Sequence, residues 1–70
     1  MADRYKIEVE VDYGKEKVRS GEMGGRVSVL RAFSEARLAA TLTNARVTVV
    51  VRDPDGRETV HRYRDGKKVN

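Results

Sequence analysis

Cysteine is absent from the 70 residues, and so are tryptophan and any long apolar run. Without cysteine the chain has no disulfide bond and no thiolate metal site, and it fits a reducing compartment. No apolar run approaches the ~20 residues that cross a bilayer. The N-terminus lacks the basic-then-apolar pattern of a signal peptide. These absences predict a cytoplasmic protein that does not associate with membranes.

The chain is small and basic. Seventy residues allow one domain, 1–70, with a small core. Small domains without disulfide bonds often gain stability by association, so a homodimer is expected. Lys and Arg number 15 against 11 Asp and Glu, for a net charge of +4. A positive domain attracts nucleic acid or acidic proteins, although here acids alternate with bases, as they do on ordinary solvated surfaces.

The clearest pattern covers residues 5–13, where apolar and charged side chains alternate. A period of two predicts a strand with one buried and one solvated face. The apolar positions are Tyr5, Ile7, Val9, Val11 and Tyr13. Residues 15–25 are charged and glycine-rich, which predicts a flexible loop over about 14–25 or a short second strand after a turn at Gly14.

A β-hairpin is the strongest signal in the C-terminal half. Residues 46–52 are rich in β-branched side chains, and the following Asp-Pro-Asp-Gly sequence fits a type I turn with Gly56 in the left-handed region. This turn fixes the register of the two strands. Val47, Val49 and Val51 then face Tyr63, His61 and Thr59 on the core side. Residues 66–70 are expected to fray.

The middle of the chain allows two interpretations. Ser28 fits the N-cap of a helix that runs to Thr43, and Asn44 fits its left-handed end. Ala and Leu also alternate over 36–42, as they would in a strand. We favour the helix, because consecutive alanines are poor strand material.

These elements predict an α+β fold, a small two-layer domain of the order β-(β)-α-β-β. One helix packs on a mostly antiparallel sheet of three or four strands. The alternative is a five-stranded small β-barrel in which residues 26–43 are partly strand. The predicted core comprises Ile7, Val9, Val11, Phe33, Val47, Val49, Val51 and Tyr63.

The helix carries apolar residues on two sides. Its small-residue stripe suits packing on the sheet; it comprises Val29, Ala32, Phe33, Ala36 and Ala40. Val27, Leu38 and Leu42 fall nearly opposite, with Arg31 beside them. A helix that covers a sheet needs one apolar face only. Val27, Arg31, Leu38 and Leu42 are therefore predicted to bind a partner.

Nothing in the sequence assembles a catalytic site. His61 is the only histidine, and it has no nucleophile or second ligand to act with. The glycines at 21–25 lack the spacing of a phosphate-binding loop. Carboxylates at Glu8, Glu10 and Asp12 point along one solvated strand face. We expect no enzyme activity, cofactor, metal ion or small-molecule substrate.

A second surface is rich in arginine. Arg46, Arg52, Arg62 and Arg64 share the solvated face of the hairpin and suit phosphate binding. No aromatic residue joins them, because Tyr5, Tyr13 and Tyr63 are predicted to face the core. If the first strand lies beside the last, Glu8 and Glu10 neutralise Arg62 and Arg64.

The sequence thus predicts a non-catalytic interaction module that self-associates or binds a protein partner. The alternative is a nucleic-acid-binding domain that uses the arginine-rich sheet face. A further alternative is an engineered scaffold without a natural function, because residues 5–13 and 52–68 resemble idealised designed strands and turns.

Overall fold

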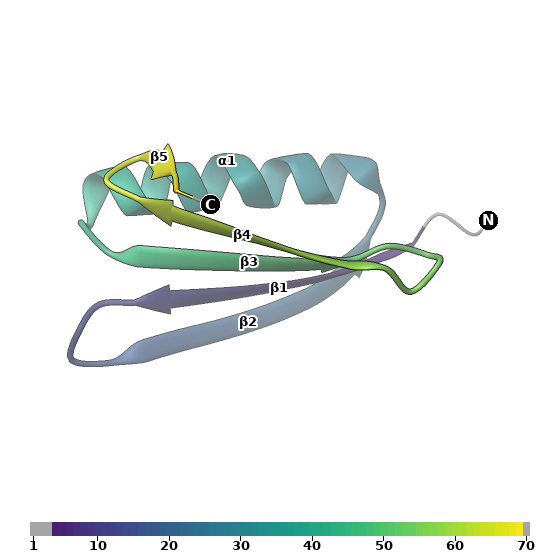
Figure 1. The fold of residues 1–70 in the computed structure, drawn as a ribbon, viewed down its shortest axis with the longest axis horizontal. Helices are drawn as coiled ribbons and strands as arrows, with labels where there is room; N and C mark the ends of the chain where they lie inside the picture. Colours follow the sequence, from purple (N-terminus) through teal and green to yellow (C-terminus); the bar gives the residue numbers. More distant parts are fainter. Residues whose placement is uncertain (1–3, 70) are drawn as a thin grey trace.

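The computed structural model of the chain describes residues 4–69. Its elements follow the order β1 (Tyr5–Asp12), β2 (Lys17–Gly24), α1 (Arg26–Leu42), β3 (Arg46–Arg52), β4 (Glu58–Arg64) and β5 (Lys67–Lys68). The strands form one sheet in the order β2-β1-β3-β4-β5, and every neighbouring pair is antiparallel. The helix lies along one face of this sheet (Figure 1).

The predicted α+β class is confirmed. The chain leaves β2, passes through α1 and returns as β3, with β1 between the two strands. The barrel alternative is wrong, because the sheet is open and residues 26–42 are helical. The sheet has one strand more than the three or four expected. The additional strand, β5, pairs with β4, so residues 67 and 68 are ordered where fraying was predicted. Residue 70 lies outside the described part.

Of the two alternatives for residues 14–25, the structure has the second strand after a turn at Gly14 and not the flexible loop. Residues 17–24 form β2, which pairs with β1 along its whole length, from Asp12 opposite Lys17 to Tyr5 opposite Gly24. Only two residues around Gly14 separate the closing pair, in which the Tyr13 N–H donates to the Glu16 carbonyl at 2.9 Å. The strand lacks a clear apolar alternation because the helix covers little of it. Pairing with β1 in this hairpin stabilises it.

The predicted register of the second hairpin is confirmed. Val49 lies opposite His61 and Val47 opposite Tyr63. In the turn, Gly56 has a φ of +87°, the left-handed conformation expected of it. The Asp53 carboxylate accepts hydrogen bonds from the backbone N–H groups of residues 55 and 57, at 3.0 and 2.9 Å. These bonds fix the turn and therefore the register.

The helix begins two residues before the predicted cap. Gly25 is the N-cap, and no side chain caps the helix, so Ser28 is not the cap. The early start depends on Gly24, because a Cβ there would overlap the Ser28 side chain. The chain can therefore turn from strand to helix within one residue. At the other end Asn44 has a φ of +59°, as expected.

The core lies between α1 and the central strands. Ile7, Val47, Val49, Val51 and Tyr63 are buried as predicted, while Val9, Val11 and Phe33 are partly buried against them. The helix adds buried Ala32, Ala36 and Ala40. Alanines at this interface bring the helix axis close to the sheet. Their small side chains also limit how much of the sheet one helix can cover.

Candidate functional site

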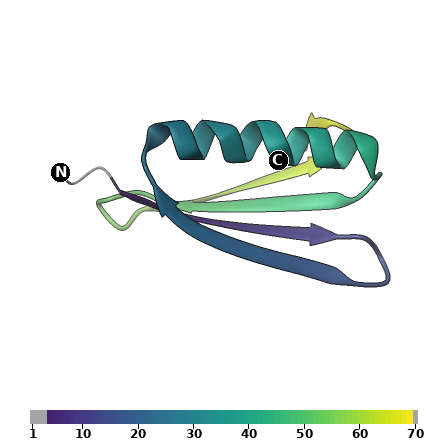
Figure 2. The same cartoon turned by 180° about the vertical axis from the view of Figure 1, so that it is seen from behind.

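The inner side of α1 is the predicted small-residue stripe. Ala32, Ala36 and Ala40 face the sheet and are buried, with Val29 and Phe33 partly buried beside them. Figure 2, the view from behind, shows the helix lying over the sheet, with its outer side directed away from the strands. The helix therefore presents a complete side to solvent.

That outer side carries four large aliphatic residues among exposed polar and charged ones. Val27, Leu30, Leu38 and Leu42 are exposed to 78%, 65%, 57% and 73% of their surfaces. A single exposed aliphatic residue is ordinary in any protein, but several on one helix face commonly indicate an interaction surface. The sequence predicted three of these residues. It missed Leu30, which lies next to the half-buried Phe33 side of the helix.

The exposed residues have a regular spacing. Starting at Val27, steps of three, four, four and three residues reach Leu30, Ser34, Leu38 and Thr41. With 3.6 residues per turn, these positions form one stripe along the helix. Leu42 extends its C-terminal end. We call these six residues the outer stripe: Val27, Leu30, Ser34, Leu38, Thr41 and Leu42.

Charged residues lie within and beside the outer stripe, because helical geometry places Arg31 between Leu38 and Leu42 and Glu35 next to Leu42. Arg31, the fourth predicted partner-binding residue, lies on the side facing β2, where its guanidinium is 3.3 Å from the Glu22 carboxylate. Both side chains are at least half exposed, so this ion pair contributes little stability. Glu35 is exposed one turn further along the same side of the helix. A basic and an acidic residue therefore share this flank.

The four predicted arginines share the open face of the sheet but do not form one cluster. Arg46 and Arg52 are the two ends of β3, about 20 Å apart at the rise of a strand. Arg52 is bound to Glu58 at 3.2 Å. The other three form a basic end of the sheet with Lys67, which lies opposite Arg64. We call Arg46, Arg62, Arg64 and Lys67 the basic end.

The strand order does not meet the condition under which Glu8 and Glu10 were expected to neutralise Arg62 and Arg64. β1 lies beside β3, not β4, so Thr48 separates Glu10 from Arg62 along the sheet. Glu10 instead binds Arg19 on β2 at 3.0 Å. The expectation that Tyr13 faces the core is also wrong. Its side chain is 46% exposed, and it lines the same shallow depression as Arg46 and Arg64.

His61 has a structural environment. Its Nε2 lies 3.2 Å from the Thr59 hydroxyl, and its ring packs against Phe33 at a centroid distance of 4.7 Å. Burial lowers the pKa of His61 below its usual 6.5, and the charge of Lys68 lowers it further. The imidazole is thus held mainly as a packing group between helix and sheet.

The described part of the chain, residues 4–69, contains neither a cluster of metal ligands nor a membrane-spanning helix. No three of its His, Asp and Glu side chains lie together in a way that could hold a metal ion. None of its helices is long and apolar enough to span a membrane. Comparison of the chain with protein-family models, curated proteins and solved structures finds no match.

Proposed function

We propose that this domain is a non-catalytic interaction module that self-associates through the outer stripe of α1. The observation that carries the proposal is the exposure of four large aliphatic side chains on the helix side away from the core. Burying apolar surface is favourable by about 25 cal/mol per Å². A second copy of the chain supplies an apolar stripe of the same length.

The stripe is self-complementary in one arrangement. In a two-fold interface, if residue i contacts residue j of the partner, j also contacts i. An antiparallel helix pair with its axis at Ser34 places Leu30 opposite Leu38 of the second copy, and Val27 opposite Thr41. The small Ser34 lies at the crossing point, where it lets the two helices approach closely. Leucines then interdigitate on both sides of it.

The charges beside the stripe also meet in this arrangement. In an antiparallel two-fold pair, equivalent sides of the two helices face each other. Arg31 of one copy then lies about two residues, or about 3 Å, along the helix from Glu35 of the other, and the two Glu35 residues are equally close to each other. In a parallel pair, opposite sides of the two helices face each other, so Arg31 of one copy would not lie beside Glu35 of the other. The opposite-charge and like-charge contacts are each of about 0.2–1 kcal/mol, so the charges modulate the antiparallel pair and the apolar stripe carries the proposal.

The small size of the stripe indicates that the dimer is weak. A helix of 17 residues is about 25 Å long. One helix pair buries less than the roughly 1,200 Å² of a standard stable interface. We therefore expect a weak dimer with a Kd of about 1 μM or above.

Sedimentation equilibrium over a range of concentrations tests this proposal. The wild type should show a monomer–dimer equilibrium, and Leu38→Glu with Leu42→Glu should yield a folded monomer. The matched control is Val18→Glu with Met23→Glu, which changes two exposed apolar residues on β2 and should still dimerise. A monomeric wild type at concentrations well above this Kd would reject self-association.

A second candidate function is nucleic-acid binding, favoured by the basic end. Arg46, Arg62, Arg64 and Lys67 lie on three neighbouring strands, with exposed Tyr13 nearby. Four phosphate contacts predict a logarithmic salt slope of about −3 to −4 for duplex DNA. Arg62→Ala with Arg64→Ala should reduce this slope by about two, whatever the DNA sequence. Absence of binding at about 50 mM salt would reject this function.

A further inference from the structure

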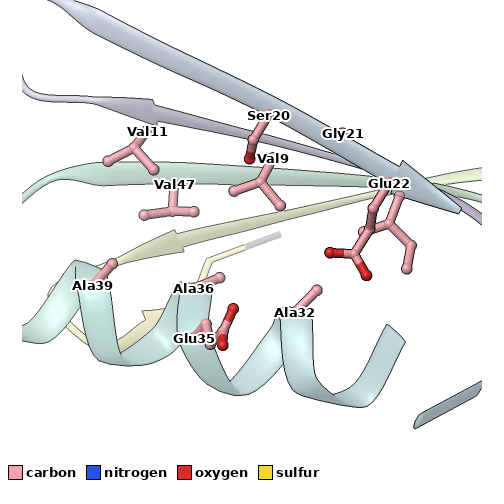
Figure 3. A pocket seen from close by; sticks show the side chains of 11 residues that line it. Val9, Val11, Ser20, Gly21, Glu22, Ala32, Glu35, Ala36, Ala39 and Val47 are labelled. Atoms are coloured by element: carbon pink, nitrogen blue, oxygen red, sulfur yellow. The ribbon is translucent and has the colours of Figure 1, made fainter. Parts of the chain in front are cut away.

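The helix leaves part of the sheet uncovered on the β2 side. A cavity of about 230 Å³ opens there between α1 and the strands β1 and β2. Figure 3 shows its lining. Val9, Val11, Ala36 and Ala39 make its floor and one wall apolar, and Ser20 on β2 leaves space on the other side. The cavity is smaller than the roughly 300–1,000 Å³ of typical small-molecule pockets, so it suits inserted side chains.

Two carboxylates lie at the same opening. Figure 3 shows Glu22 reaching from β2 and Glu35 on the helix, both among the residues that line the cavity. Arg31 binds Glu22 at 3.3 Å. Glu35 has no hydrogen bond or ion pair with any other residue in the described range 4–69. The opening therefore keeps a negative charge on a chain whose net charge is +4. Its charge complements a cation on a ligand that also carries apolar groups.

The strand beside the cavity also has an open backbone edge. β2 is the first strand of the sheet, and within residues 4–69 its outer edge has no partner strand. Hydrogen-bonded and non-hydrogen-bonded pairs alternate along an antiparallel ladder. The bond between Tyr13 and Glu16 sets the phase of this alternation. It follows that the N–H and C=O groups of Lys17, Arg19, Gly21 and Met23 point outward from the edge.

We infer that β2 binds an extended peptide of a partner protein, which adds as an antiparallel strand to the sheet. The backbone of the peptide bonds to the outward groups of β2. Its side chains opposite Val18 and Ser20 are apolar and extend over the cavity. Its side chain opposite Glu22 is lysine or arginine and lies near Glu22 and Glu35. In chain direction, the recognised pattern is basic-x-apolar-x-apolar.

This site is separate from the outer stripe. The cavity lies on the Ala36 and Ala39 side of α1, whereas Leu30 lies on the side near Phe33 and Tyr63. Loss of self-association and loss of peptide binding can therefore be measured independently with variants other than those of Arg31 and Glu35, which lie beside both surfaces. Leu30→Glu should weaken the dimer and leave peptide binding unchanged.

Gly21 gives a sharp test of strand addition. Its side-chain position is on the open face, where an added Cβ meets only ordinary contacts of 3.6 Å and longer. Gly21→Pro removes one outward N–H without removing a bond to β1, and proline is tolerated on edge strands. Gly21→Ala adds a Cβ and keeps the N–H, so it is the matched control. Circular dichroism checks that both variants fold.

The probe is a fluorescent, end-blocked peptide Thr-Lys-Thr-Leu-Thr-Leu-Thr, and binding is followed by anisotropy. We expect saturable binding that Gly21→Pro weakens about tenfold, as for one lost hydrogen bond, and that Gly21→Ala leaves unchanged. Replacing the peptide lysine by glutamate, or Glu35 by lysine, should weaken binding several-fold. Replacing both leucines of the peptide by threonine should abolish binding. No binding to the folded wild type, or equal binding to all peptides and variants, would overturn the inference.

Discussion

The ring of Phe33 on α1 lies 4.7 Å from the ring of His61 on β4, with the two planes inclined at 60°. This tilted contact joins the helix to the part of the sheet beyond the alanine interface. It also removes part of the imidazole from water, which is the main reason that the pKa of His61 lies below 6.5; Lys68 adds to the effect.

The lowered pKa of His61 predicts a pH-dependent stability. The unfolded chain binds a proton at a higher pH than the folded protein does, so acid favours unfolding. The contribution of His61 is complete above its unfolded pKa of 6.5 and is lost as the pH falls through the folded value. Thermal melts from about pH 7.5 to pH 5.5 should show a falling Tm. His61→Gln should remove this dependence, and an unchanged slope would show that another group causes it.

Gly56 should be required for its backbone conformation alone. An added Cβ would meet nothing within 4 Å, yet the φ is +87°. Gly56→Val should therefore destabilise the domain by about 1 kcal/mol or more. Gly56→Asn should cost less, because asparagine tolerates the left-handed region. Urea unfolding compares the two variants, and equal stabilities would contradict the turn geometry.

Ala40 should tolerate no enlargement. It is completely buried between α1 and the sheet. Ala40→Leu forces the helix away from the strands and should destabilise the domain by about 1–3 kcal/mol. Arg37→Leu introduces the same side chain at an exposed position of the helix and should change stability by less than about 0.5 kcal/mol. Chemical denaturation of both variants measures the difference.

Local sequence patterns predicted the elements whose own residues show a clear alternation, turn sequence or helix end. The alternation before Tyr13, the turn at Gly56 and the positive φ of Asn44 all appear in the structure. β2 could not be predicted with the same certainty, because its stability comes from pairing with β1 and its apolar pattern is weak. The helix start depended on a close approach of Gly24 to Ser28, which no local propensity encodes.

The candidate site was predictable in part for the same reason. A helical wheel separates the alanine side from Val27, Leu38 and Leu42, and the structure places them accordingly. Leu30 lies at the margin of the stripe, so its exposure depends on where the helix sits over the sheet. The strand order, a global property, decided which acids lie beside which arginines.

The flanking charges give a test of how two copies would pair. Glu35→Arg should bring Arg31 of each copy against a like charge and weaken the dimer several-fold, since two contacts of about 0.2–1 kcal/mol are reversed. Exchanging both residues, Arg31→Glu with Glu35→Arg, restores opposite charges and should recover most of the affinity. Sedimentation equilibrium at low salt measures all three proteins. Equal weakening by the single and double changes would exclude the antiparallel charge contact.

Cross-linking at Ser34 tests the pairing of the outer stripe most directly. The chain has no cysteine, so Ser34→Cys introduces a single thiol at the proposed two-fold axis. A disulfide forms readily only where the two Cα atoms come within about 4.4–6.8 Å. Mild oxidation should convert this variant to a covalent dimer much faster than Arg57→Cys, an exposed control in the hairpin turn. Equal, slow cross-linking of both variants would contradict self-association through this face.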